Sequence, residues 1–354
     1  MSESRLSSRA RGTACALAAA LLFGASAPLA KLLLPSVAPL MLAAIFYLGA
    51  GGVLFAARAL RGAGAAGREA PLTRADAPLL AAVTLAGGIA GPVLMLLGLE
   101  RVTGVVGALL LNLEAPFTIL LALAFFGEHL GRREVASAAL VIAGAALLGA
   151  RSGPVSVDVI GIAAIAGACL CWGLDNNWTQ RLSLRDPIEL VSLKATSAGA
   201  CMLGVALATG HSLPGAKLLA MALAVGSLSY GAGIVLAVYA LRELGAARES
   251  ALFATAPFAG ALLAIPLLGE LPRAVDCAAA GVMALGVALL VRASHDHLHA
   301  HGALEHEHSH FHDEHHRHAH EGPVEEPHSH AHRHEPLVHR HPHVSDLHHR
   351  HGHE

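Results

Sequence analysis

Long apolar runs with short polar breaks fill the chain from residue 12 to residue 292. Crossing the hydrocarbon core of a bilayer takes about 20 apolar residues in a helix, and charged residues and Gly/Pro clusters divide this region into ten runs of that kind. The alternation expected of a barrel strand is absent, so we predict an all-α integral membrane protein. The predicted transmembrane helices cover residues 13–34, 37–57, 77–99, 104–126, 134–150, 158–180, 187–209, 217–241, 248–268 and 274–292.

Several short motifs occur twice in the same order, which indicates an internal repeat. An Ala-Pro-Phe triplet is followed by Gly-Glu and then by a lone glycine, with the same spacing from Glu to Gly in both copies. Phe23-Gly24 in the first helix matches Trp172-Gly173 in the sixth, and Leu99–Val106 aligns with Leu241–Arg248. The two copies of the first pattern are Ala115-Pro116-Phe117, Gly127-Glu128 and Gly144, then Ala256-Pro257-Phe258, Gly269-Glu270 and Gly286.

Each predicted half holds five helices, at residues 12–150 and 158–292. Because five is an odd number, the second half must cross the membrane in the opposite sense to the first. Inverted repeats are a recurring architecture of secondary transporters, whose substrate site lies near the midplane between the halves.

From about residue 15 to residue 292 the chain resembles the EamA-type branch of the drug/metabolite transporter superfamily. The resemblance rests on the duplicated Ala-Pro-Phe and Gly-Glu patterns, on Phe23-Gly24 through Lys31, and on the ten predicted helices. It implies two five-helix EamA-like repeats and the transport of a small solute.

Composition agrees with a membrane protein: 54% of the residues are hydrophobic, 14% are charged and the mean hydropathy is +0.55. The formal net charge of −2 and the scattered basic residues speak against a nucleic-acid partner; the expected partner is the lipid bilayer, and a homodimer stays open. The five cysteines lie in apolar segments and are interpreted as small core residues.

The distribution of arginine and lysine predicts the orientation. Cytoplasmic loops are enriched in these residues, and most of them fall on one side if residues 1–11 form a cytoplasmic N-terminus; the first helix is predicted to stay uncleaved. This places a multi-pass protein in the cell (inner) membrane with both termini cytoplasmic. The opposite side keeps only Arg101, Arg151, Lys217 and Arg273.

The fourth helix carries the first candidate site. Ionisable groups inside a membrane are costly and are functional candidates, and here Asn112 and Glu114 precede Pro116, which frees a backbone carbonyl one turn earlier. Carboxylate, amide and carbonyl together could hold a cation or a proton. Thr255 replaces Glu114 in the second half, and Pro257 is the counterpart of Pro116. The alternative is that Glu114 only pairs with a neighbouring helix.

Polar residues in later helices complete the predicted transport cavity. Asp175, Asn176, Asn177 and Gln180 either line the cavity or mark an early end of the sixth helix. Lys194 could pair with Glu114 or Asp175, whereas Lys31 is better explained by snorkelling to the interface. Tyr230 is a candidate cavity donor, although packing or interfacial roles are the more common ones for it and for Tyr239. We interpret Glu128 and Glu270 as structural caps at helix starts.

The segment 293–354 differs in kind, because it contains all but two of the 25 histidines. Imidazole suits Ni, Co, Zn or Cu, and the low complexity predicts a disordered metal-binding tail. A pH-dependent cytoplasmic charge is the other reading. The predicted metal ligands are His295, His297, His299, His301, His306, His308, His310, His312, His328, His330, His332, His334, His339, His341 and His343.

The leading functional hypothesis is a secondary transporter, in the direction of export, that works by alternating access around Glu114 and requires no cofactor. No phosphate-binding GxxxxGK[ST] sequence occurs, so an ion or substrate gradient must supply the energy. The tail favours export of a divalent transition metal. Two alternatives remain: a metabolite, amino-acid or drug exporter with a regulatory tail, and a membrane-anchored metal buffer or sensor. Within the predicted helices, neither HExxH nor GxSxG is present to support an enzyme.

Overall fold

The computed structural model describes residues 2–61, 70–126, 131–150, 158–182, 185–244, 246–291, 295–301, 304–310, 328–334 and 337–343. The first half consists of α1 (Ser2–Leu33), α2 (Pro39–Arg61), a third segment of η1 (Arg74–Asp76), α4 (Ala77–Val83), η2 (Thr84–Ala90) and α5 (Gly91–Arg101), a fourth of α6 (Gly104–Leu110), η3 (Leu111–Leu113) and α7 (Glu114–Phe126), and α8 (Arg132–Gly149).

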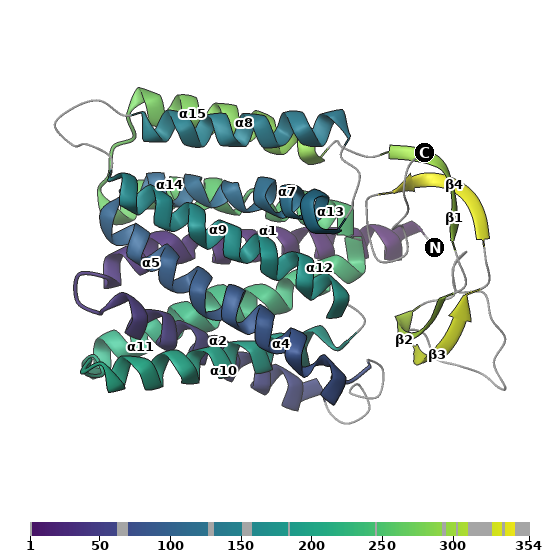
Figure 1. Ribbon diagram of the computed structural model, residues 1–354, viewed down its shortest axis with the longest axis horizontal. Coiled ribbons are helices and arrows are strands. Elements are labelled where there is room, and N and C mark those ends of the chain that lie inside the picture. The colour runs from purple at the N-terminus through teal and green to yellow at the C-terminus, as the bar shows by residue number, and fades with distance from the viewer. Residues whose placement is uncertain are drawn as a thin grey trace.

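The second half repeats this order. It consists of α9 (Val159–Thr179) with η4 (Gln180–Leu182), α10 (Pro187–Ala208), a third segment of α11 (Ala216–Val225), η5 (Gly226–Ala232) and α12 (Gly233–Leu244), a fourth of α13 (Ala246–Phe253) and α14 (Ala256–Leu268), and α15 (Ala274–Val291). In Figure 1 the helices lie roughly parallel in stacked layers, with α8 and α15 in the uppermost layer and α10, α11 and α2 toward the bottom.

Within the described residues, nine helical spans are long and apolar enough to cross a membrane. The fifth predicted helix, 134–150, is the one without such a span; it falls on α8, which begins with Arg132, Arg133 and Glu134 and packs along α15. The all-helical membrane region is therefore confirmed. At the N-terminus α1 starts at Ser2, earlier than the predicted 13–34, and its apolar span is Ala10–Leu33.

Side-chain caps set several helix starts. Asp158 accepts hydrogen bonds from the backbone N–H groups of Ile160 and Gly161 at the start of α9, at 2.9 and 3.1 Å. Asp186 does the same for α10, where Pro187 occupies the first turn. Such caps satisfy backbone donors that a helix leaves unpaired, which is why both helices begin where the sequence places an aspartate after a break.

Reciprocal glycine contacts relate the halves by an approximate two-fold axis. A Cβ on Gly144 of α8 would lie 2.5 Å from Met283 of α15, and a Cβ on Gly286 of α15 would lie 2.9 Å from Val141 of α8. Gly51 of α2 lies against Thr196 of α10 in the same way that Gly199 lies against Leu48. Each contact and its two-fold-related counterpart link matching positions of the two halves.

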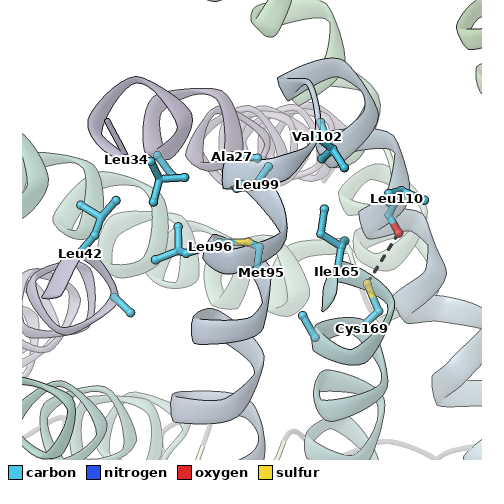
Figure 2. Packing of buried hydrophobic residues seen from close by; sticks show 14 of the residues in the cluster. Ala27, Leu34, Leu42, Met95, Leu96, Leu99, Val102, Leu110, Ile165 and Cys169 are labelled. Atoms are coloured by element: carbon cyan, nitrogen blue, oxygen red, sulfur yellow. Dashed lines mark hydrogen bonds between the residues drawn. The ribbon is translucent and has the colours of Figure 1, made fainter. Parts of the chain in front are cut away.

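The apolar core lies where the halves meet. Met95, Leu96 and Leu99 of α5 are buried against Ala27 of α1 and Ile165 of α9 (Figure 2). In the same view the Cys169 thiol points at the carbonyl oxygen of Leu110, with the sulfur 3.7 Å from the oxygen. The core contains alanine as well as larger aliphatic side chains. The alanines let the helix backbones approach closely, as is common in membrane proteins.

Within its described residues the tail has four short strands, β1 (His295–His301), β2 (Leu304–His310), β3 (His328–His334) and β4 (Leu337–His343). β1 pairs antiparallel with β4 and β2 with β3, so that His297 is opposite His341 and His306 opposite His332. The H-x-H pattern has the two-residue period of a strand, and the disordered metal-binding tail stays a prediction. His312 lies outside the described residues.

Candidate transport site

The fourth segment has an irregular turn just before Pro116, where the sequence predicts a freed backbone carbonyl. Pro116 cannot donate a hydrogen bond to the preceding turn, and the helix changes to the 3₁₀ turn η3 just before it. The carbonyl oxygens of Leu110 and Leu111 receive the Cys169 thiol of α9, at 3.7 and 3.8 Å. The second half is interrupted at the same point, between α13 and α14, where Pro257 lies in the first turn of α14. The predicted spans 104–126 and 248–268 are each present as one helical span, Gly104–Phe125 and Glu249–Leu268, with this irregular turn inside it.

Glu114 is half-buried and hydrogen-bonds across to α9. The side-chain amide of Asn176 donates to the Glu114 carboxylate at 2.8 Å and to the Thr118 hydroxyl at 3.3 Å. Asn177 donates to the Thr118 carbonyl at 3.0 Å. The neighbouring helix thus holds Glu114 through a neutral amide, which leaves the carboxylate free to carry a charge or a proton.

Asn112 does not join Glu114. Its amide donates to the Leu109 carbonyl at 2.9 Å and lies 4.0 Å from the Met283 sulfur of α15. Residues two positions apart on a helix face different directions, so the predicted trio of Asn112, Glu114 and freed carbonyl is not assembled as one site.

Asp175 and Lys194 form an ion pair inside the bundle. The Lys194 ammonium donates to Asp175 Oδ2, and the two side chains are only 15% and 9% exposed, respectively. Thr179 donates to the other carboxylate oxygen at 3.1 Å. α9 continues to Thr179 and η4 to Leu182, so these polar residues do not mark an early helix end. Of the two partners considered for Lys194, the structure selects Asp175.

A π-helical turn positions this ion pair. In η2 hydrogen bonds run from residue i+5, as the Gly91 N–H donates to Ala86 O. The next donor would be Pro92, which has none, so the Gly87 carbonyl is left for side chains. Tyr47 donates to it at 3.0 Å and Trp172 at 3.1 Å.

Gly87 also makes room for the aspartate. A Cβ on Gly87 would lie 2.0 Å from Asp175 Oδ2. Gly87 is therefore the point where α2, the third segment, α9 and the ion pair with α10 come together. Tyr47, Gly87 and Trp172 are not among the site residues predicted from the sequence. The signal that could have found them is the proline five residues after Gly87, in a glycine-rich segment.

Aromatic rings occupy the part of the bundle formed by α1, α2, η5 and α13. Phe23 meets Tyr230 edge to face with ring centroids 5.3 Å apart, and Phe253 with centroids 5.0 Å apart. Tyr47 lies 6.0 Å from Tyr230, centroid to centroid. Tyr230 is thus linked through Tyr47 to Gly87, whereas Tyr239 is 48% exposed on the outer face of its helix.

Under the two-fold relation, the charged residues of the site in one half correspond in position to uncharged or aromatic residues in the other half. Because Phe23-Gly24 matches Trp172-Gly173 and Leu48 matches Thr196, each charged residue has an uncharged mate in the other half. The site is therefore chemically different on its two sides. The pairs are Asp175 with Ser26, Lys194 with Phe46, Glu114 with Thr255, and Trp172 with Phe23.

The repeated motifs contact each other across the halves. A Cβ on Gly24 would lie 2.3 Å from the Ala256 carbonyl oxygen, and one on Gly173 would lie 3.0 Å from the Thr118 backbone nitrogen. The glycine of each first helix thus packs on the Ala-Pro-Phe break of the opposite half, which fixes the broken fourth segments around the site.

One end of the bundle, here called the Lys31 end, holds the turn between α5 and α6. Lys31 donates to the carbonyls of Leu99 and Val102, the latter at 2.8 Å. Glu270 accepts from the backbone N–H groups of Gly104 and Val105, at 2.7 and 2.8 Å. Capping was predicted for Glu270, but it caps a helix of the other half.

A second cross-half contact lies at the same end. Arg101 donates to Asp158 at 2.9 Å, and this hydrogen bond, together with the α9 cap, holds the pKa of the Asp158 carboxyl below its usual value. At the opposite end, here called the Glu189 end, Arg58 pairs with Glu189 at 3.1 Å and Arg185 with Asp76 at 3.0 Å. Both ends are thus tied by contacts between the halves.

The inverted halves, the broken fourth segments and the charged groups between them define the class of multi-pass membrane transporters. The model of the EamA-like transporter family matches residues 10–150 and again residues 159–292. The chain belongs to this family.

Two further likenesses agree with the family. An uncharacterized transporter of Methanothermobacter thermautotrophicus (strain Delta H) is 32% identical over 291 residues, covering 77% of this chain and 84% of the relative. A protein of known crystal structure superposes with a TM-score of 0.58 at 22% identity, over 79% of this chain and 97% of its own, which speaks for the fold.

Proposed function

We propose that this transporter is a secondary exporter, in which the two halves expose a shared midplane site to one side of the membrane and then to the other. Glu114 binds the transported cation or the coupling proton. The observation that carries this proposal is a carboxylate inside the bundle whose hydrogen-bond partner is the neutral amide of Asn176. A charged group inside the membrane is energetically costly and is therefore a candidate for a functional role.

The proposal includes an orientation: the protein lies in a bacterial-type inner membrane, and both termini face the cytoplasm. It makes the Glu189 end cytoplasmic and the Lys31 end external. The support is the excess of arginine in the loops on the Glu189 side.

Glu114→Gln is the direct test. Glutamine keeps the hydrogen-bonding shape with Asn176 but cannot ionise, so gradient-driven flux in proteoliposomes is expected to fall to background. Glu134→Gln is the control, because Glu134 caps its own helix on the exposed surface at Gly131. Equal flux in the wild type and in Glu114→Gln would remove Glu114 from the mechanism.

A divalent transition metal is the specific substrate that the tail favours. The support is the H-x-H composition together with the strand register, which sets histidine opposite histidine along β2 and β3. In this version the tail collects metal at the membrane for export through the helical bundle.

Deleting residues 293–354 is expected to raise the cellular content of Ni, Co, Zn or Cu and to lower tolerance of that metal. A full-length variant with the tail histidines replaced by asparagine controls for length. Unchanged metal content combined with accumulation of an organic metabolite would support the organic-solute exporter. A tail that protects cells equally well with Glu114→Gln would support the metal buffer.

A further inference from the structure

The ion pair between Asp175 and Lys194 has a feature that a purely structural pair does not need. Both charges come from the second half, while the matching residues of the first half, Ser26 and Phe46, are uncharged. A buried ion pair contributes little net stability compared with apolar residues of similar volume. The first half shows that this fold closes around the same place without one.

Asp175 is held in position independently of the lysine. Thr179 donates to Oδ1, and the carboxylate lies against the backbone of Gly87, whose carbonyl is fixed by Tyr47 and Trp172. The lysine is a flexible side chain that reaches this place from another helix. Within the described part of the chain, the hydrogen bond found for its ammonium group is the one to Asp175.

We propose that the Lys194 ammonium is a built-in substitute for the cationic group of the solute, and that solute and proton exchange on Asp175. A cation that binds Asp175 displaces the ammonium. An N–H bond at Nζ then breaks, the electron pair stays on nitrogen, and the proton leaves to water at the open end. A singly charged solute brings in one positive charge for the one proton that departs, so that Asp175 keeps a single counter-ion. A divalent metal ion leaves one positive charge in excess at Asp175.

The physical reason for proton release is the cost of an uncompensated charge. An ammonium ion deprived of its counter-ion in a low-dielectric interior is strongly unfavourable, whereas the neutral amine is not. The other titratable groups around this pair are Glu114 of α7 and the hydroxyl of Tyr47 of α2. The other ion pairs described above lie at the two ends of the bundle: Arg58 with Glu189 and Arg185 with Asp76 at the Glu189 end, and Arg101 with Asp158 at the Lys31 end.

This inference rests on the proposed export function but assigns the proton exchange to Lys194, a group distinct from Glu114. The chemistry required is a positive charge that oxygen ligands accept, with aromatic rings nearby. Both a divalent metal ion and an organic ammonium ion meet it, so the experiment has an arm for each.

Calorimetric binding to the full-length, detergent-solubilised protein, in two buffers of different ionisation enthalpy, measures the protons released per cation bound. The probes are nickel and zinc chloride in one arm and 2-phenylethylamine in the other. We expect the wild type to release one proton more per cation than Lys194→Gln. The histidine tail is identical in both proteins, so its own protons cancel in the difference.

Lys194→Arg separates exchange from a structural role. A guanidinium keeps the ion pair but does not give up its proton, so this variant is expected to melt like the wild type while neither binding the cation at Asp175 nor releasing a proton. A structural pair would instead be fully rescued by arginine. Wild-type binding and proton release by Lys194→Arg would overturn the proposal.

The remaining outcomes are also decisive. If Lys194→Gln does not fold, the neutral pair Asp175→Asn with Lys194→Gln takes its place and must lose both binding and proton release. Equal proton release by the wild type and either variant rejects the exchange. Because binding is measured without flux, a correct proton count with no transport in proteoliposomes would reject the export function and leave the exchange site intact.

Discussion

Replacing Gly226 with alanine is expected to leave little folded protein in the membrane. A Cβ at this position would lie 2.2 Å from the carbonyl oxygen of Phe46 and 2.5 Å from its Cα. These are backbone atoms of α2, which cannot rotate away as a side chain can. Overpacking costs about 1–3 kcal/mol where side chains adjust, and we expect more here because η5 must move as a whole. That is a large part of the roughly 5–15 kcal/mol that stabilises a typical protein.

Gly204→Ala is the matched control, since a Cβ on Gly204 of α10 meets nothing within 4 Å. In a helix the change to alanine favours folding by about 1 kcal/mol. The measurement is the yield and melting temperature of each variant by size-exclusion chromatography in detergent. Two variants with the same yield and melting temperature would show that α2 and η5 are not in contact as described.

Glu270→Ala is expected to loosen the Lys31 end selectively. The change removes the acceptor of two hydrogen bonds from the Gly104 and Val105 N–H groups. Hydrogen bonds to a charged group contribute about 1.5–3 kcal/mol each, and a carboxylate at a helix N-terminus adds a favourable dipole interaction. The start of α6 should therefore open far more often.

Hydrogen exchange followed by mass spectrometry measures this opening in peptides that cover residues 104–110. We expect exchange there to accelerate by at least about tenfold, which corresponds to a loss of about 1.4 kcal/mol of local stability. Glu134→Ala is the control, because it removes a cap within one helix of one half and should speed exchange only near Gly131. Unchanged protection of α6 in Glu270→Ala would contradict the cross-half cap.

The sequence was sufficient for the helical segments and for the repeat, because both are one-dimensional patterns. It did not reveal which copies touch. Phe23-Gly24 and Ala256-Pro257-Phe258 each have a copy at the matching position of the other half. Their spacing along the chain does not show that Gly24 packs on Ala256 of the opposite half. Spacing measures position along the chain, whereas contact between halves depends on the two-fold axis that relates them.

The candidate site was predicted in part for a similar reason. Hydropathy marks Glu114, Asp175 and Lys194 as unusual inside a membrane. Charged side chains avoid lipid, so their position between the helices could be predicted as well. The π turn did not, because it differs from an α-helix by a one-residue shift that leaves hydropathy unchanged. Gly87 and its two donors, Tyr47 and Trp172, were missed as a result.

The cap that Glu270 places on α6 has a consequence for synthesis of the chain. Residues 104 and 105 leave the ribosome long before residue 270 does, and chains are built from the N-terminus. Until the last loop is inserted, the start of α6 has no carboxylate to accept its N–H groups. The first half can therefore enter the bilayer alone but reaches its final form only when the second half arrives. Two halves expressed as separate polypeptides should accordingly complete each other after insertion.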